Sequence, residues 1–230
     1  MRKKIYIFIL CIIFFGFRSN AQNYWLTEQH DFHENTEVIC GVAEANPEND
    51  PLGGGFLASG FIFDEYYPFL IRIDRYGNEL WRKYHLDFEH FPSENGGTKV
   101  SHYTEDGNFL VGSNWGLMKI NSETGEEMWD EVVGTPENPA VMYIEKYGAT
   151  RYIIVRFGWH YCYTFDISTK EVIKTLDFGI YWENFCVKLT TDGKFIFSGE
   201  YYYPNEDEYK LTLCRTNTDL EYDDSFGYKG

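Results

Sequence analysis

The side chains in this sequence that could do chemistry are carboxylates, histidines and aromatic rings, so their spacing is the first thing to test. The chain has no Gly-x-Ser-x-Gly elbow, no His-Glu-x-x-His motif and no phosphate-binding glycine loop. Gly53, Gly54 and Gly55 are followed by neither a helix signal nor a Lys-Ser pair, which predicts a turn leading into a strand. The sequence therefore predicts no catalytic residue and no cofactor.

Metal binding is the second kind of chemistry to test. The six histidines show no metal-ligand spacing, and they lie at positions 30, 33, 85, 90, 102 and 160. The acid-rich runs 48–50 and 205–208 offer oxygen ligands, but neither has the spaced Asp-x-Asp-x-Asn-Gly pattern of a calcium loop. We predict solvated loops at both runs and no metal site.

Aromatic rings beside carboxylates form the more informative pattern. Phe, Trp and Tyr make up 19% of the chain. Several rings fall in connections that we expect on one face of the fold: Tyr66, Tyr67, Trp115, Trp159, Tyr201, Tyr202 and Trp182. Exposed rings of this kind suit sugar stacking or a protein-binding hot spot. The alternative, to which we give equal weight, is that the rings pack between neighbouring loops and only stabilise them.

Short strands must position these rings, because helical periodicity is absent. Runs rich in Val, Ile, Tyr, Phe and Thr alternate with Gly, Asn and Asp clusters, as in strands joined by turns. The runs recur as an internal repeat whose equivalent positions, Asp74, Asn121, Asp166 and Thr216, are 47, 45 and 50 residues apart. That period is close to one four-stranded blade of a β-propeller.

The repeat predicts an all-β, β-propeller-like fold of about four blades of four antiparallel strands, either as a closed ring or as an open or truncated arc. We expect the blades at about 37–86, 97–134, 140–178 and 184–230, with 22–36 as an N-terminal segment that adds a ring-closing strand. Asp74, Asn121 and Asp166 should bond the turn backbone that follows them. Trp81 and Trp129 should cover the edges between blades.

Two segments resemble known propeller repeats. Residues 69–81, Phe-Leu-Ile-Arg-Ile-Asp-Arg-Tyr-Gly-Asn-Glu-Leu-Trp, resemble the repeat of PQQ-like (quinoprotein-type) β-propellers secreted by Bacteroidetes-type bacteria. Residues 215–230 contain Asp-Asp-Ser-Phe-Gly and resemble the delta-60 type of repeat. The resemblance covers about 37–230 and implies architecture rather than activity. Quinoprotein dehydrogenases have more blades, a cofactor channel and a calcium site, which four units cannot build.

The N-terminus predicts export. A basic start at 1–4, an apolar run at 5–17 and small residues at 19–21 are typical of a cleaved signal peptide, 1–21. The apolar run has about 13 residues, short of the ~20 that span a bilayer, so we expect no membrane span. Cleavage removes four basic residues and leaves 16 basic against 36 acidic residues. The resulting net charge of −20 disfavours binding to nucleic acid.

We interpret Cys40, Cys162, Cys186 and Cys214 as small core residues rather than as disulfide-bonded cysteines.

These observations predict a secreted, periplasmic or cell-surface protein that is a non-catalytic propeller module for binding or scaffolding. Its partner would be a glycan or an extracellular protein on the aromatic loop face. One alternative is an enzyme of propeller type, a PQQ-related oxidoreductase remnant or a glycosidase using two of Glu65, Glu183 and Glu200 at about 5–10 Å. Another is a structural unit without a ligand.

Overall fold

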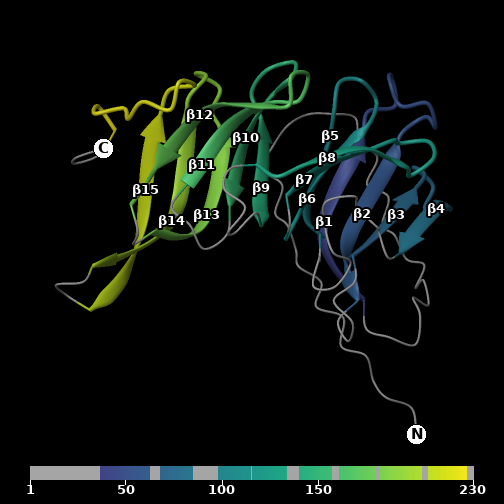
Figure 1. Ribbon diagram of the computed structural model, residues 1–230, viewed down its shortest axis with the longest axis horizontal. Coiled ribbons are helices and arrows are strands. Elements are labelled where there is room, and N and C mark those ends of the chain that lie inside the picture. The colour runs from purple at the N-terminus through teal and green to yellow at the C-terminus, as the bar shows by residue number, and fades with distance from the viewer. Residues whose placement is uncertain are drawn as a thin grey trace, which may run out of the picture.

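The chain folds entirely into β-strands and turns where its structure is described. The computed structural model describes residues 37–62, 68–84, 98–114, 116–133, 140–156, 161–179, 182–203 and 207–226. The fifteen strands form four antiparallel sheets in which each strand pairs with its neighbour in sequence (Figure 1). No helix that is long and apolar enough to cross a membrane occurs within these ranges. The predicted all-β, propeller-like class is confirmed.

The four sheets follow one another along the chain. Sheet 1 contains β1 (Glu37–Ala45), β2 (Gly55–Ile62), β3 (Pro68–Ile73) and β4 (Glu79–Tyr84). Sheet 2 contains β5 (Thr98–Tyr103), β6 (Phe109–Ser113), β7 (Leu117–Ile120) and β8 (Glu127–Glu131). Sheet 3 contains β9 (Val141–Lys146), β10 (Arg151–Arg156), β11 (Tyr161–Asp166) and β12 (Glu171–Asp177). Sheet 4 has three strands, β13 (Trp182–Leu189), β14 (Phe195–Tyr203) and β15 (Glu208–Thr216).

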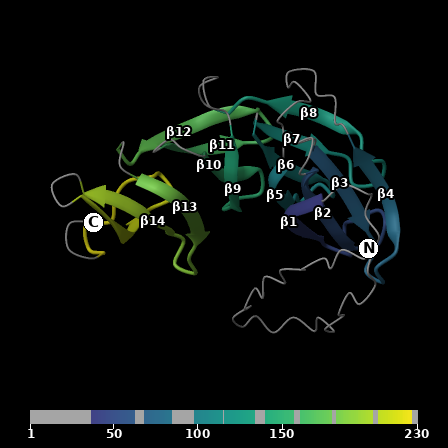
Figure 2. The same cartoon turned by 90° about the horizontal axis from the view of Figure 1, so that it is seen from below.

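The sheets are arranged as blades of an open arc. The first strands of successive sheets, β1, β5, β9 and β13, contact one another in that order and line the inside of the arc. The fourth strands lie on the outside, and the sheets do not close into a ring (Figure 2). We call the face of a sheet toward the preceding sheet its leading face, and the face toward the following sheet its trailing face.

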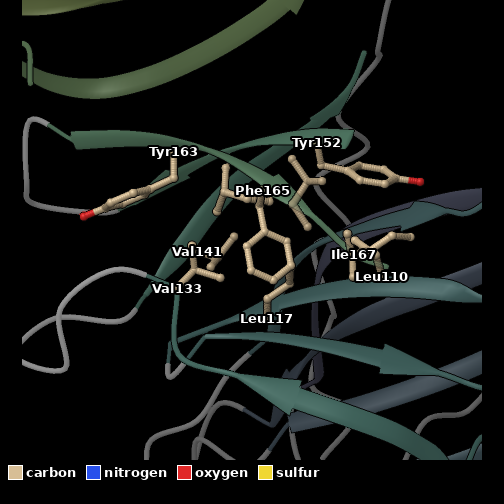
Figure 3. Packing of buried hydrophobic residues seen from close by; sticks show 10 residues of the cluster. Leu110, Leu117, Val133, Val141, Tyr152, Tyr163, Phe165 and Ile167 are labelled. Carbon is tan, nitrogen blue, oxygen red and sulfur yellow. The ribbon is translucent and has the colours of Figure 1, made fainter. Parts of the chain in front are cut away.

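Strand alternation supplies the apolar side chains that hold adjacent sheets together. At the junction of sheets 2 and 3, Leu110 and Leu117 on the trailing face of sheet 2 meet Tyr152 and Phe165 on the leading face of sheet 3 (Figure 3). All four side chains are buried, with exposed fractions of 2% or less. Two further clusters fill the junction of sheets 1 and 2 and that of sheets 3 and 4. Burial of such side chains contributes about 1.5–3 kcal/mol each, so these junctions hold the arc together.

One junction also contains a buried ion pair. Arg72 donates to Asp50 at 2.7 Å, and neither side chain is exposed. Asp50 also accepts hydrogen bonds from the Gly54 N–H at 2.7 Å and the Ser122 hydroxyl at 2.5 Å, so the loop after β1 is joined to sheet 2. The predicted solvated loop at 48–50 is therefore wrong for Asp50, because this carboxylate satisfies Arg72 inside the junction.

The two repeat tryptophans cover sheet edges, as the repeat predicted. Trp81 in β4 donates its indole N–H to the Ser122 carbonyl at 2.9 Å and lies over Gly125. A Cβ at Gly125 would come within 2.9 Å of the indole ring, and the φ of +71° there also favours glycine. Trp129 in β8 packs against Phe165 of sheet 3, with ring centroids 6.4 Å apart.

The same turn ends the third strand of every sheet. Asp74, Asn121 and Asp166 each accept, through Oδ1, the backbone N–H two residues ahead, at 2.7–3.0 Å. In sheet 4 the position belongs to Asn217, which accepts from the Asp219 N–H at 2.9 Å. Thr216 was therefore predicted one residue too early, because β15 continues through Thr216 before the turn begins.

The cysteines divide into two kinds. Cys162 and Cys214 are buried in the cluster between sheets 3 and 4, where burial raises the pKa of both thiols. Cys40 and Cys186 are exposed thiols. The interpretation of all four as core residues is therefore wrong for Cys40, which lies at a β-bulge in β1, and for Cys186, which lies on the exposed face of sheet 4.

Candidate aromatic binding surface

The predicted binding rings are only partly brought together by the described structure. Tyr66, Tyr67, Trp115 and Trp159 lie outside the described residues. Trp182 is the first residue of β13, and its backbone pairs with that of Tyr201. The structure describes Tyr201 and Tyr202 fully, so we build the site from these two residues.

Tyr201 and Tyr202 lie in a strand and not in a connecting loop. The prediction of a loop at 201–204 is wrong for these two residues, because β14 and β15 stay paired as far as Tyr203 and Glu208. Tyrosine favours the extended, half-buried surface of a strand, and a matching tyrosine, Tyr209, stands across from Tyr202. The hairpin turn thus falls beyond Tyr203.

Among the described strands, β14 and β15 form the longest hairpin. Each strand has nine residues, whereas the pairing of β13 with β14 ends at the Trp182–Tyr201 pair. The last part of the hairpin, Tyr202 to Tyr203 and Glu208 to Tyr209, therefore extends past β13. Figure 1 shows this end of β14 and β15 projecting from the sheet. Tyr201, at the base of this projecting end, packs against the buried cluster between sheets 3 and 4, and Tyr202 and Tyr203 beyond it are partly exposed.

The tyrosines of the hairpin form two pairs on opposite faces. Tyr201 and Tyr203 lie edge to face with ring centroids 4.8 Å apart, and the Lys210 ammonium lies 4.8 Å above the Tyr203 ring. On the other face Tyr202 and Tyr209 have centroids 5.0 Å apart. Such contacts contribute about 0.5–1.5 kcal/mol each and fix the rings before any partner binds.

The rings remain accessible in this arrangement. Tyr209 is 52% exposed, and the other three tyrosines are partly exposed. The Tyr202 hydroxyl donates to Asp207 at 2.6 Å, which orients the ring at the hairpin turn. Tyr203 and Tyr209 were not among the predicted site residues. The signal for them is the near-symmetric placing of tyrosines on either side of 204–207, visible once β14 is recognised as a strand.

Two of the three residues named for the glycosidase alternative pair with each other in the backbone register. Glu183 in β13 pairs with Glu200 in β14. Glu200 is exposed on the trailing face of sheet 4. Glu65 lies outside the described residues. Within the described ranges, no group of three His, Cys, Asp or Glu side chains is placed to hold a metal ion.

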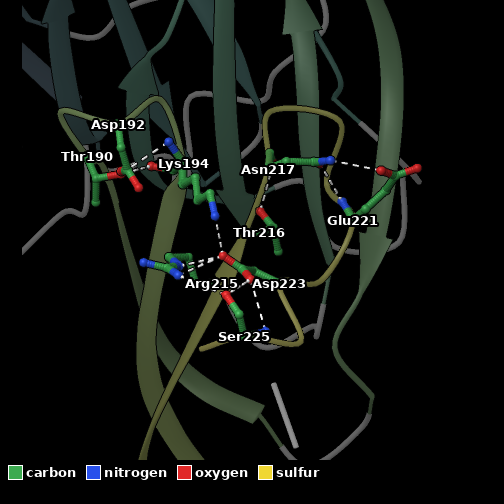
Figure 4. Close-up of polar contacts among 9 residues, drawn as sticks. All are labelled: Thr190, Asp192, Lys194, Arg215, Thr216, Asn217, Glu221, Asp223 and Ser225. Carbon is green, nitrogen blue, oxygen red and sulfur yellow. Dashed lines mark hydrogen bonds and ion pairs between the residues drawn. The ribbon is translucent and has the colours of Figure 1, made fainter. Parts of the chain in front are cut away.

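Two further titratable groups, His102 and Asp223, have structural partners. His102 in β5 is bonded through Nδ1 to the Tyr103 carbonyl at 2.7 Å, and burial lowers the pKa of this imidazole. At the end of sheet 4, Asp223 binds both Lys194, at 2.5 Å, and Arg215, at 2.8 Å (Figure 4). The hydrogen bond from Lys194 is the main reason that the pKa of Asp223 lies well below its usual range. These bonds fasten the turn after β15 to its sheet.

Comparisons with known proteins give the fold and leave the activity open. No family model and no curated protein sequence matches the chain. Hydrazine synthase from Kuenenia stuttgartiensis is similar in structure with a TM-score of 0.58 and 12% identity, over 79% of this chain and 51% of that one. Sqt1 from Saccharomyces cerevisiae has a TM-score of 0.53 and 11% identity, over 79% and 49%.

A protein of unknown function from Bacteroides caccae also matches, with a TM-score of 0.47 and 16% identity, over 79% of this chain and 61% of that one. The chain thus spans about half to three fifths of the length of these three proteins. Hydrazine synthase and Sqt1 have β-propeller-like folds, which fits an arc of four sheets as part of such a fold.

Proposed function

We propose that the protein is an exported, non-catalytic binding module whose β14–β15 hairpin docks into a groove on an extracellular protein. The observation that carries this proposal is the projecting hairpin with its two fixed tyrosine pairs. Tyrosine is enriched in protein hot spots because a rigid ring supplies much contact area at a small loss of conformational entropy. The repeat pattern and signal-like N-terminus support a relation to the secreted PQQ-like propellers.

The shape of the hairpin favours a protein over a glycan as the partner. Small-molecule and sugar sites are concave and enclose most of the ligand. The projecting end of the hairpin is convex, and its rings meet each other edge to face or at a tilt of 45°. A convex ribbon with rings on both faces is suited to insertion into a partner's groove.

The test is a binding screen on the purified chain against a panel of extracellular proteins and, in parallel, a glycan array. The double variant Tyr201→Ser/Tyr202→Ser should weaken protein binding by about 30-fold or more, as expected for hot-spot residues. The matched control is Tyr76→Ser, which removes a 66% exposed tyrosine from the turn between β3 and β4. Equal affinity for both variants would refute the hairpin as the binding surface. Glycan binding that is lost in the double variant alone would replace protein by glycan.

A second candidate is glycoside hydrolysis, because the register sets Glu183 opposite Glu200. Retaining glycosidases need two carboxyl groups about 5–5.5 Å apart, and the backbones of these two residues are neighbours in the sheet. Turnover of aryl glycosides that Glu200→Gln abolishes would support this candidate. Hydrolysis that is absent, or unchanged in Glu200→Gln, would leave the binding module.

A further inference from the structure

The β14–β15 hairpin contains a pair of tyrosines whose surroundings favour one-electron oxidation. Tyr202 in β14 and Tyr209 in β15 are directly opposite each other in the strand register. Their ring centroids lie 5.0 Å apart, and the ring planes are tilted by 45°. Tyr209 is 52% exposed and Tyr202 is partly exposed, so both rings are open to an oxidant in solution. Two phenols in contact at a surface can be joined covalently when each of them loses an electron.

The Tyr202 ring also has a proton acceptor in place. Its hydroxyl donates to the Asp207 carboxylate at 2.6 Å, a distance typical of a strong O–H···O⁻ hydrogen bond. Removal of an electron from a phenol makes its hydroxyl strongly acidic, so oxidation is easiest where a base already holds the proton. Because Asp207 accepts that proton as the electron leaves, we expect Tyr202 to be the first ring of the pair to be oxidised.

Several other described tyrosines lie beside positive charges instead. The hydroxyl accepts a hydrogen bond from an arginine in three of them, Tyr76, Tyr84 and Tyr163. On the opposite face of the hairpin, the Lys210 ammonium lies 4.8 Å above the Tyr203 ring. A positive charge beside a ring opposes removal of an electron from it. The Tyr202–Tyr209 pair is therefore favoured over the Tyr201–Tyr203 pair, although the centroids of the latter are also close, at 4.8 Å.

We propose that Tyr202 and Tyr209 form an oxidative cross-linking site, at which a haem peroxidase supplied with hydrogen peroxide converts the two phenols into a dityrosine. Each phenol loses one electron and its hydroxyl proton, and the two radicals form a carbon–carbon bond between ring positions next to the hydroxyls. The ring hydrogen at each of these positions then moves to the phenol oxygen, which restores both phenols. The chain loses two hydrogen atoms overall, and one hydrogen peroxide takes up the two electrons and two protons as two molecules of water.

The fold allows this bond to form within one chain. Residues directly opposite in paired strands have Cβ atoms about 4.5–5.5 Å apart, so Tyr202 and Tyr209 can be joined while β14 and β15 stay paired. Two reacting groups held in contact also react with each other faster than with a second chain in dilute solution. The cross-link would fasten the two strands to each other in the part of the hairpin that extends past β13.

The test is treatment of the purified chain, dilute and without any partner protein, with hydrogen peroxide and a haem peroxidase. The chain is alkylated first, because the exposed thiols of Cys40 and Cys186 would compete for the oxidant. Digestion with a protease that cleaves after glutamate separates Tyr202 from Tyr209 at Glu208 unless the two are joined. Mass spectrometry should find the two peptides joined and lighter by two hydrogens than their sum, and dityrosine fluorescence should rise in parallel.

Three variants test which residues are responsible. Tyr202→Phe should lower the dityrosine yield of the single-chain fraction about fivefold or more, since Tyr209 then has no phenol opposite it. Tyr76→Phe is the matched control, because it removes a 66% exposed tyrosine and should leave the yield unchanged. Asp207 has a φ of +53°, which asparagine tolerates, so Asp207→Asn retains the turn and removes only the base. Cross-linking of Asp207→Asn should be about tenfold slower.

Four results would overturn the proposal. They are a cross-link at other tyrosines, cross-linking only between chains, an equal yield in Tyr202→Phe, and no dityrosine in the chain under conditions that couple N-acetyltyrosine. An unchanged rate in Asp207→Asn would overturn the role of Asp207 as the proton acceptor. Because no partner protein is present, failure of the cross-link is distinguishable from failure of the proposed partner binding.

Discussion

The outermost sheet faces at the two ends of the arc differ in how far their apolar side chains are exposed. On the leading face of sheet 1, Ala58, Phe69 and Ile71 are buried and Val42 at the first strand is 61% exposed, whereas on the trailing face of sheet 4 Leu211 is 79% exposed. The repeat places apolar side chains on both faces of each sheet, whether or not a neighbour follows. Whether a side chain is buried therefore depends on where its sheet lies along the arc, whereas its residue type follows the repeat. Equivalent residues at a closed junction and at the open end should then respond very differently to the same substitution.

The largest difference in the free energy of unfolding is expected between substitutions of Arg72 and Arg215, which occupy equivalent positions in β3 and β15. Arg72→Ala leaves Asp50 charged and buried without its partner, which should lower the free energy of unfolding by about 3–5 kcal/mol. Arg215→Ala leaves Asp223 with Lys194 near the surface and should cost about 1 kcal/mol or less. Urea denaturation with a constant m-value measures both. Equal losses would contradict the contrast between junction and open end.

A smaller difference in stability is expected between substitutions of Leu117 and Leu213, which also occupy equivalent positions. Leu117→Ala opens a cavity between sheets 2 and 3 and should cost about 2–5 kcal/mol. Leu213→Ala should change the free energy of unfolding by only about 0.5 kcal/mol, since the side chain is half exposed. Thermal melts of the two variants make the comparison. A large loss for Leu213→Ala would show that its face is covered in solution.

The smallest effect concerns the turn that Asp223 fastens to sheet 4. The pKa of Asp223 is lowered in the folded chain, chiefly by Lys194, so the tether stabilises the fold above the unfolded carboxyl pKa of about 4. It is lost only as the pH falls through the lowered folded pKa. Amide exchange in 217–226 should therefore stay slow on titration from pH 7 to pH 4. Asp223→Asn should speed that exchange about tenfold at pH 7 and leave β10 unchanged, whereas exchange that is already fast at pH 5 in wild type would argue against the tether.

The fold was predictable because its signals are local. The strand alternation, the Asp and Asn turns and the spacing of the repeat all lie within a few residues or one repeat of each other. The paired tryptophans on the fourth strands followed from the same pattern. Each of these features is decided by short stretches of chain, so a single sequence contains them.

The site was less predictable because it depends on partners far apart in the chain. Tyr201 and Tyr202 lie in a strand because β15 pairs with them, and the run of three tyrosines before Pro204 does not reveal that pairing. Asp50 is buried because Arg72, 22 residues later, needs a counter-charge. Cys186 is exposed because no described sheet lies against the trailing face of sheet 4, which the residues around the cysteine do not reveal.

The turn that closes each third strand has a consequence for how such a chain changes in length. Its side-chain bond spans two residues, in sheets 1, 2, 3 and 4 alike. The bond that begins each corner therefore lies within its own blade, and only the corner of sheet 2 is described with further contacts to Asp50 and Trp81 of sheet 1. Duplication or deletion of one whole unit of 45–51 residues would leave the Asp or Asn bond at each remaining corner intact. Propeller arcs of this kind can therefore be lengthened or shortened by genetic recombination in whole blades, without redesign of the blades that remain.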